Sequence, residues 1–205
     1  MKTLVNNVKK SSLAAIILLA VLFSVNASAA TVKVGKETSH TEITKVVVSG
    51  NTNVLMIQGN SEFLKIDDAD LDKVSVKQLG STLNISSFEN EPVTIVLYIK
   101  DIYRIDASGK ATVRTVGKFN VKNLQVILND DATARVKATT ESLYTVIDGH
   151  AKLELIGTSN NHISKMAGRA KLNTNKFAAL ATENMNMLAG VATTKAIIQS
   201  VIVGK

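Results

Sequence analysis

Apolar and polar residues alternate along most of the chain from Lys45 onward, and this period of two is typical of strands with one buried and one wet face. The alternation is clearest at residues 103–115, 126–138 and 143–155, where Asp130 is the one charged residue at an inward position. Helical spacing does not fit these segments. We therefore predict an all-β fold.

A short sequence motif recurs within the alternating segments: a small residue, an Ala two positions later, and an apolar residue two positions after that. Its copies, the last one degraded, are Gly109–Val113, Ala132–Val136, Gly149–Leu153, Gly168–Leu172 and Gly190–Thr194. They follow one another at intervals of about 20 residues, which is typical of solenoids whose repeats bury their apolar sides against neighbouring repeats. We predict a parallel β-solenoid in which the small inward residues form tight corners between stacked coils.

Strand-like segments also precede these repeats, so we expect a β-rich N-terminal portion that leads into the solenoid without a linker. The tail Ala196–Val203 is predicted to be a last strand that closes the solenoid end, because an open apolar edge invites pairing with another chain. The predicted plan is a signal peptide at 1–30, a short N-terminal segment at 31–44, and a single domain at 45–205.

The first thirty residues have the three parts of a secretory signal peptide. Lys2, Lys9 and Lys10 supply the positive charge, Leu13–Val25 is the apolar core, and Ala27–Ala29 provides a small-residue cleavage site. The apolar run is shorter than the ~20 residues that a membrane-spanning helix needs. We expect export to the periplasm or cell surface, with no membrane span after cleavage.

Cysteine is absent from the chain, so disulfides, cysteine catalysis and cysteine-ligated metals are excluded. The chain has 24 Lys and Arg against 17 Asp and Glu, and three of those lysines belong to the signal peptide. Aromatic residues make up only 4% of the chain and form no stacking array. An exported protein of modest charge without such an array is a poor candidate for binding nucleic acid.

Several sequence elements resemble one family, the "putative auto-transporter adhesin, head GIN domain" proteins. These elements are Val46–Gly50, Val54–Gly59, Leu83–Ile85, Val96–Tyr98 and Ser108–Gly109, and the likeness extends from about Lys45 to Val203. The resemblance implies a two-sheeted β-superhelix similar to pectin-lyase-type solenoids, with Gly-Ser-Gly-like corners, and a role in adhesion without catalytic residues. This chain departs from the family at those corners, where Asp131-Ala132 and Asp148-Gly149 replace a full Gly-Ser-Gly.

Candidate metal ligands are few. Asp68, Asp70 and Asp72 alternate like the start of a calcium loop, but an EF-hand would need Gly where Lys73 stands and Glu where Leu79 stands. A solvated acidic hairpin explains these residues better. The three histidines, His40, His150 and His162, have no metal spacing. We expect no metal and no cofactor.

One alternative function is a polysaccharide-cleaving enzyme, since acid–base cleavage needs two carboxylates at a fixed separation. In the repeat alignment Asp131 and Asp148 share a column, so they are candidates for stacked neighbours. A polar outer face explains two such acids more simply, and we expect no catalytic residues.

The strongest positive signal is a set of cations predicted to share one outward face: Lys110, Arg135, Lys152, Arg169 and Lys171. Like charges at strand spacing repel unless they are screened or paired. This face is predicted to bind anionic glycans or lipid headgroups, and an ordinary solvated face is the alternative. The leading functional prediction, which rests largely on the resemblance, is an exported, non-catalytic, adhesin-like binding module. A self-assembling structural envelope protein, acting as a homo-oligomer, is the third alternative.

Overall fold

The computed structural model describes residues 29–32, 41–117, 119–188 and 191–195. Its fourteen strands belong to a single mixed sheet. No α-helix occurs in these ranges, and the one helical element among them is the 3-10 helix η1 (Asp68–Lys73). The predicted all-β fold is confirmed.

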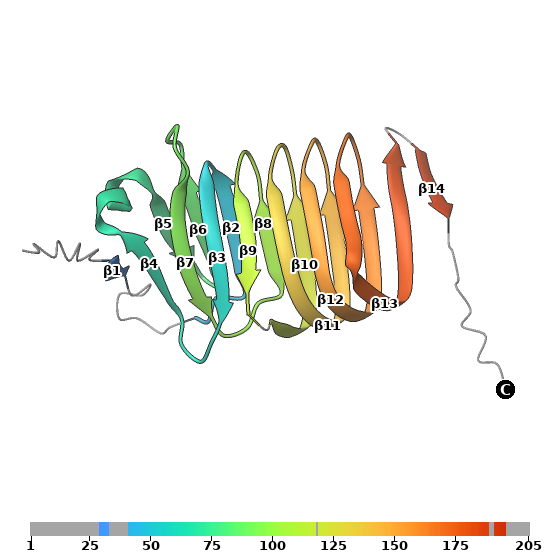
Figure 1. Ribbon diagram of the computed structural model, residues 1–205, viewed down its shortest axis with the longest axis horizontal. Coiled ribbons are helices and arrows are strands. Elements are labelled where there is room, and N and C mark those ends of the chain that lie inside the picture. Colours follow the sequence, from blue (N-terminus) through green and yellow to red (C-terminus); the bar gives the residue numbers. More distant parts are fainter. Residues whose placement is uncertain (1–28, 33–40, 118, 189–190, 196–205) are drawn as a thin grey trace, which may run out of the picture.

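The strands follow one another along the chain with short connections (Figure 1). In chain order they are β1 (Ala29–Val32), β2 (Lys45–Gly50), β3 (Thr52–Gln58), β4 (Phe63–Asp67), β5 (Ser75–Leu79), β6 (Thr82–Ser87), β7 (Val93–Ile99), β8 (Arg104–Ala107), β9 (Thr112–Val116), β10 (Asn120–Leu128), β11 (Thr133–Ile147), β12 (Lys152–Met166), β13 (Lys171–Leu188) and β14 (Val191–Lys195).

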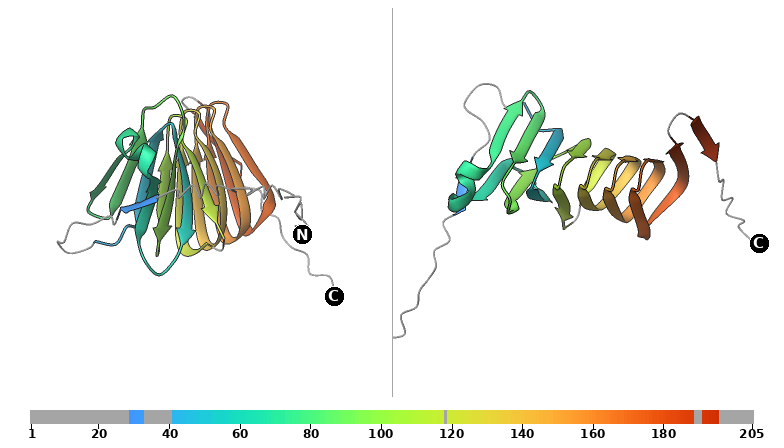
Figure 2. Two further views of the ribbon diagram at one scale, coloured as in Figure 1. Left: turned by 60° about the vertical axis from the view of Figure 1, so that its left-hand side comes forward. Right: turned by 90° about the horizontal axis from the view of Figure 1, so that it is seen from above.

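The sheet curls back on itself and makes two facing walls (Figure 2). The first wall contains β1, β4, β7, β3, β9 and the N-terminal halves of β11, β12 and β13. The second wall contains β5, β6, β2, β8, β10 and the C-terminal halves of the same three strands. Pairing is parallel through the middle of both walls, whereas β1, β4, β5 and β14 pair antiparallel.

The long strands β11, β12 and β13 stack in parallel, each one coil further along the chain. Thr133 lies opposite Lys152, and Lys152 lies opposite Lys171. This register corrects the repeat alignment derived from the sequence. Ala132 was aligned with Gly149, but the Lys152 amide donates to the Ala132 carbonyl, so the alignment was wrong by two residues.

Asp130, not Ala132, occupies the corner position of its coil. Its φ of 60° is that of the glycines at the same corner in the other coils, such as Gly149 with φ 72°. Aspartate is among the few residues that tolerate this conformation. The Asp130 carboxylate also accepts a hydrogen bond from the Gly109 amide at 2.9 Å. The one charged residue predicted at an inward position is therefore an exposed corner residue that bonds to the preceding coil.

The corners stack so closely that a side chain at Gly149 would collide with the neighbouring coil. A Cβ atom there would lie 2.9 Å from the Asp130 carbonyl oxygen. At the next corner, a Cβ on Gly168 would lie 2.8 Å from the Gly149 carbonyl oxygen. Small corner residues were predicted for this reason, and Gly149 and Gly168 fit that prediction, whereas Ala132 does not occupy a corner.

We expect Gly149→Ala to destabilise the protein by about 2–4 kcal/mol, because it adds a collision to the cost of a left-handed alanine. Gly80→Ala is the matched control. Gly80 also has a positive φ, of 59°, but a Cβ there meets nothing within 4 Å. The control should cost only about 1 kcal/mol. Urea unfolding of both variants measures the difference, and equal losses would contradict close stacking of the corners.

The hydrophobic core fills the space between the two walls. All apolar side chains predicted to face inward between residues 103 and 155 are buried, except that of Tyr103, which is 46% exposed. The alternation therefore identifies the core correctly. Its largest fully buried members include Met56, Leu64, Leu83, Ile95, Leu97, Ile105, Phe119 and Leu124.

Gln58 belongs to one of the sequence elements that resemble the family. Its side chain joins the end of β3 to the end of β7 and the start of β10. Its side-chain amide donates to the carbonyl oxygens of Lys100 and Asn120 at 3.1 and 2.8 Å. Its side-chain oxygen accepts from the Asn120 amide at 2.7 Å. The glutamine thus bonds to backbone groups of two other segments, which gives this element a structural role.

His162 is a polar exception near the C-terminal end of the core. It is only 2% exposed, its Nε2 lies 3.1 Å from the Thr145 hydroxyl, and its ring meets that of Phe177 edge-on. Burial lowers the pKa of His162 from 6.5 to about 4. The folded state therefore holds this side chain neutral.

Because the folded pKa of His162 lies below the unfolded value, its contribution to stability is full above pH 6.5 and is lost as the pH falls toward 4. We expect the free energy of unfolding to fall by about 2 kcal/mol between pH 7 and pH 5 through this group. His162→Gln should abolish that component. Urea unfolding at both pH values tests this, and the same pH dependence in both proteins would contradict it.

Two predictions concern residues outside the described ranges. Residues 1–28 of the predicted signal peptide and the predicted closing strand Ala196–Val203 lie there. The last two residues of the predicted signal peptide, Ala29 and Ala30, begin β1, which pairs with β4. Within the described residues, no helix has the length and apolar character to cross a membrane.

Candidate functional site

The outer surface of the first wall, from β9 to β13, carries two rows of aligned side chains. The first row is Thr112, Thr133, Lys152 and Lys171, and the second is Arg114, Arg135, Glu154 and Asn173. Because the strands are paired in parallel, equivalent positions of successive coils lie side by side, about 4.8 Å apart.

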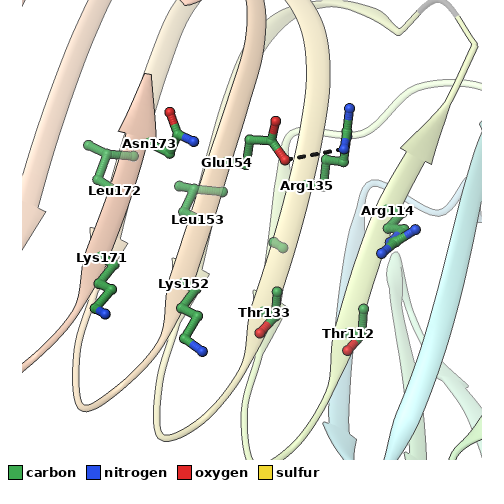
Figure 3. A pocket seen from close by; sticks show the side chains of 11 residues that line it. Thr112, Arg114, Thr133, Arg135, Lys152, Leu153, Glu154, Lys171, Leu172 and Asn173 are labelled. Atoms are coloured by element: carbon green, nitrogen blue, oxygen red, sulfur yellow. Dashed lines mark ion pairs between the residues drawn. The ribbon is translucent and has the colours of Figure 1, made fainter. Parts of the chain in front are cut away.

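These two rows line a shallow depression of about 340 Å³ (Figure 3). The side chains shown in Figure 3 come from four successive strands of the same wall. We call this site the basic depression, because four of its lining residues are Lys or Arg and only Glu154 is acidic. Arg135 and Glu154 form an ion pair, with Nη1 3.3 Å from Oε2.

Like charges lie directly opposite each other at two places in the basic depression. Arg114 is paired in register with Arg135, and Lys152 with Lys171. Such pairs destabilise a sheet, by an amount that salt screens. A bound anion would remove this repulsion, so the arrangement is chemically suited to hold carboxylate, sulfate or phosphate groups.

The structure divides the five cations predicted from the sequence. Lys152 and Lys171 are neighbours in one row, and Arg135 belongs to the next row. Lys110 and Arg169 lie instead in the corner turns, at the row of Asp131 and His150. The five cations therefore occupy three rows and not one: Lys110 and Arg169 lie in the turns, and Arg135 moves to another row than Lys152 because its repeat was aligned two residues out of register.

Arg114 was missed by the sequence analysis for the same reason. The displaced alignment compared Thr112 with Arg135, whereas the structure pairs Arg114 with Arg135. A repeat alignment anchored on Asp130 instead of Ala132 would have placed both arginines in one column.

The predicted stacking of Asp131 on Asp148 is also wrong. The Asp148 amide donates to the Leu128 carbonyl, which aligns Asp148 with Asn129, whereas Asp131 lies beside His150 at 3.7 Å. The Asp148 carboxylate accepts from the Gly149 amide at 2.6 Å and so belongs to its own turn. These two acids are therefore not stacked neighbours.

The acidic segment Asp68–Asp72 lies in η1, where Asp70 forms an ion pair with Lys73 at 2.7 Å. Across the part of the chain that the structure describes, no three His, Asp or Glu side chains are grouped so that they could hold a metal ion. The basic depression is therefore the candidate functional site.

Fold and site together define an all-β protein with a basic outer face. The family model described as "Putative auto-transporter adhesin, head GIN domain" matches residues 42–190. The chain belongs to this family, as the sequence elements predicted. No curated protein matches the sequence.

Solved structures of similar fold include proteins from Bacteroides and Parabacteroides species. A "putative adhesin" of Bacteroides fragilis has 17% sequence identity and a TM-score of 0.64, with 77% of this chain and 75% of that chain covered. A "putative lipid binding protein" of Parabacteroides distasonis has 14% identity and a TM-score of 0.57, with 78% of each chain covered. A "putative adhesin" of Parabacteroides merdae has 11% identity and a TM-score of 0.55, with 78% and 77% covered. At these identities the likeness concerns the fold alone.

We expect Arg114→Gln to stabilise the protein slightly, by about 0.2–0.5 kcal/mol at low salt, since it removes the repulsion from Arg135. Arg135→Gln should not, because it also removes the ion pair with Glu154. Urea unfolding at low and high salt measures both changes. A loss of stability in Arg114→Gln that salt leaves unchanged would show that Arg114 supports the fold.

Proposed function

We propose that the protein is an exported, non-catalytic, adhesin-like module of the bacterial envelope or cell surface, and that its basic depression binds the anionic groups of glycans. The observation that carries this proposal is the pairing of like charges, Arg114 with Arg135 and Lys152 with Lys171, on one exposed wall. Membership of an adhesin family and the signal-peptide pattern of residues 1–30 support the location.

A polymer suits this site better than a small anion. The rows cross four strands at right angles to the chain direction, so cationic positions recur along the stack at about the strand spacing of 4.8 Å. An extended polyanion can contact several of them at once. Each contact is weak on an exposed surface, and multivalent binding makes their sum effective.

The proposal includes the architecture. We propose that the parallel part, from β8 to β13, is a two-walled β-solenoid. The parallel registers of β8 with β10, β9 with β11, and β11 through β13 support this, as do the stacked corners at Gly109, Asp130, Gly149 and Gly168. Such a solenoid holds the outward rows in a fixed, rigid spacing, which pre-organises the binding face.

The test is binding of the protein, purified from an exporting host, to an acidic and a neutral polysaccharide at low and high salt. We expect binding to the acidic polymer only, weakened by salt. Lys152→Gln with Lys171→Gln should weaken it about tenfold or more, since each lost contact is worth roughly 1 kcal/mol. Shortened polymer products would contradict the non-catalytic assignment.

The matched control removes the same charge from the second wall, with Lys122→Gln and Lys165→Gln. Lys122 lies 3.8 Å from Glu141, and Lys165 lies over the Tyr144 ring at 5.5 Å. This control should bind the acidic polymer like the unmodified protein. If both double variants lose binding equally, net charge and not the basic depression is responsible.

A further inference from the structure

The first wall continues beyond the basic depression into an apolar outer surface. Two rows of outward residues run from β9 toward β4. The row that starts at Arg114 continues with Leu55 and Val96, and the row that starts at Val116 continues with Ile57, Tyr98 and Phe63. We call the six residues other than Arg114 the apolar patch. Val116 is 44% exposed, and the other five are partly exposed. None of the six belongs to the core cluster between the walls.

The aromatic end of the apolar patch is ordered and carries a cation. The rings of Phe63 and Tyr98 stack with centroids 4.1 Å apart and planes 12° apart. The Lys65 ammonium lies over both rings, 5.6 and 5.5 Å from their centroids. Aromatic rings beside a lysine whose stem lies along an apolar surface are typical of the boundary between water and lipid.

The apolar patch and the basic depression are continuous. Leu55 lies directly opposite Arg114, and Ile57 directly opposite Val116. Apolar positions also continue between the cations on the far side, since Ile156 lies opposite Lys137. A single outer surface thus combines cations with apolar side chains over the length of the wall.

The second wall combines charge and apolar surface in another way. It presents outward apolar residues too, such as Ile127 and Val146, which are paired in register. Its cations are placed differently. Asp106 receives Lys45 at 3.0 Å and Arg104 at 2.7 Å, Lys122 lies 3.8 Å from Glu141, and Lys165 lies over the Tyr144 ring at 5.5 Å. The first wall instead places Arg114 beside Arg135 and Lys152 beside Lys171, next to apolar surface.

We propose that the first wall docks flat on an anionic lipid surface, with the basic depression over the headgroups and the apolar patch at the headgroup–acyl boundary. This inference goes beyond the proposed function, because it adds a lipid surface as a second partner of the same basic depression. Charge complementarity carries the argument, since each Lys or Arg near an anionic membrane strengthens attachment. Partial burial of the apolar patch adds a component that salt does not screen.

A soluble polyanion alone leaves the apolar patch without a role. Carboxylate or sulfate groups would contact Arg114, Lys152 and Lys171, but such a strongly hydrated polymer would gain little from covering the aliphatic side chains of Ile57 and Val116. A lipid surface satisfies both halves of the wall at once. Binding of the anionic polysaccharide only is the competing outcome of the test.

The experiment is flotation of the protein, purified after export so that the apolar segment Leu13–Val25 is removed, with vesicles of phosphatidylcholine alone or mixed equally with phosphatidylglycerol. We expect binding to the mixed vesicles only, reduced but not abolished by high salt. Lys152→Gln with Lys171→Gln should weaken it about tenfold or more. Equal binding to both vesicle types would overturn the role of charge.

A second pair of variants isolates the apolar component. Ile57→Thr with Val116→Thr should weaken vesicle binding about tenfold and leave binding of the acidic polysaccharide unchanged. Val146→Thr with Ile163→Thr is the matched control on the second wall and should change neither. Urea unfolding confirms that each variant is folded.

The outcomes separate the two proposals. Polysaccharide binding without vesicle binding overturns the lipid inference and leaves the proposed function standing. If Ile57→Thr with Val116→Thr leaves vesicle binding unchanged, the role of the apolar patch is overturned. Absence of both kinds of binding overturns both proposals.

Discussion

The close stacking of the corner turns is the constraint on which the rest of the structure depends. At Gly149 and Gly168 the backbone of one coil lies so near the next that there is no room for a Cβ atom. The amides on either side of each corner bond to carbonyls of the preceding coil. Every strand that follows a corner therefore starts in a fixed register, and equivalent positions of successive coils must lie side by side.

The core could be predicted from the sequence because burial depends only on the alternation of apolar and polar residues within each strand. A period of two places Ala134, Val136 and Leu153 inward whatever strand lies beside them. Tyr103 is the exception, since it precedes β8 and its side chain is 46% exposed. Local chemistry thus determines which side chains are buried, without knowledge of their neighbours.

The site could not be predicted in the same way, because it depends on which residues are neighbours. The motif at Ala132 resembles the motifs that begin with glycine, yet Asp130 forms the corner. Its left-handed backbone cannot be predicted from the type of its side chain. The two-residue displacement separated Arg114 from Arg135 and joined Asp131 to Asp148. The apolar patch was missed for a related reason, since Phe63 and Tyr98 meet only through the antiparallel pairing of β4 with β7.

The register that stacks the core also stacks the charges, and this explains why the first wall is unusual. In a parallel stack, a cation repeated in successive coils lies beside its equivalent, as Lys152 lies beside Lys171. On the second wall, Asp106 forms ion pairs with both Lys45 and Arg104 and so offsets the repulsion between these two cations. On the first wall only Glu154 does so, and it reaches Arg135. Folding does not account for the remaining cations, because their repulsion opposes it. The proposed anionic partner would neutralise them, and this is the reason for proposing this wall as the binding face.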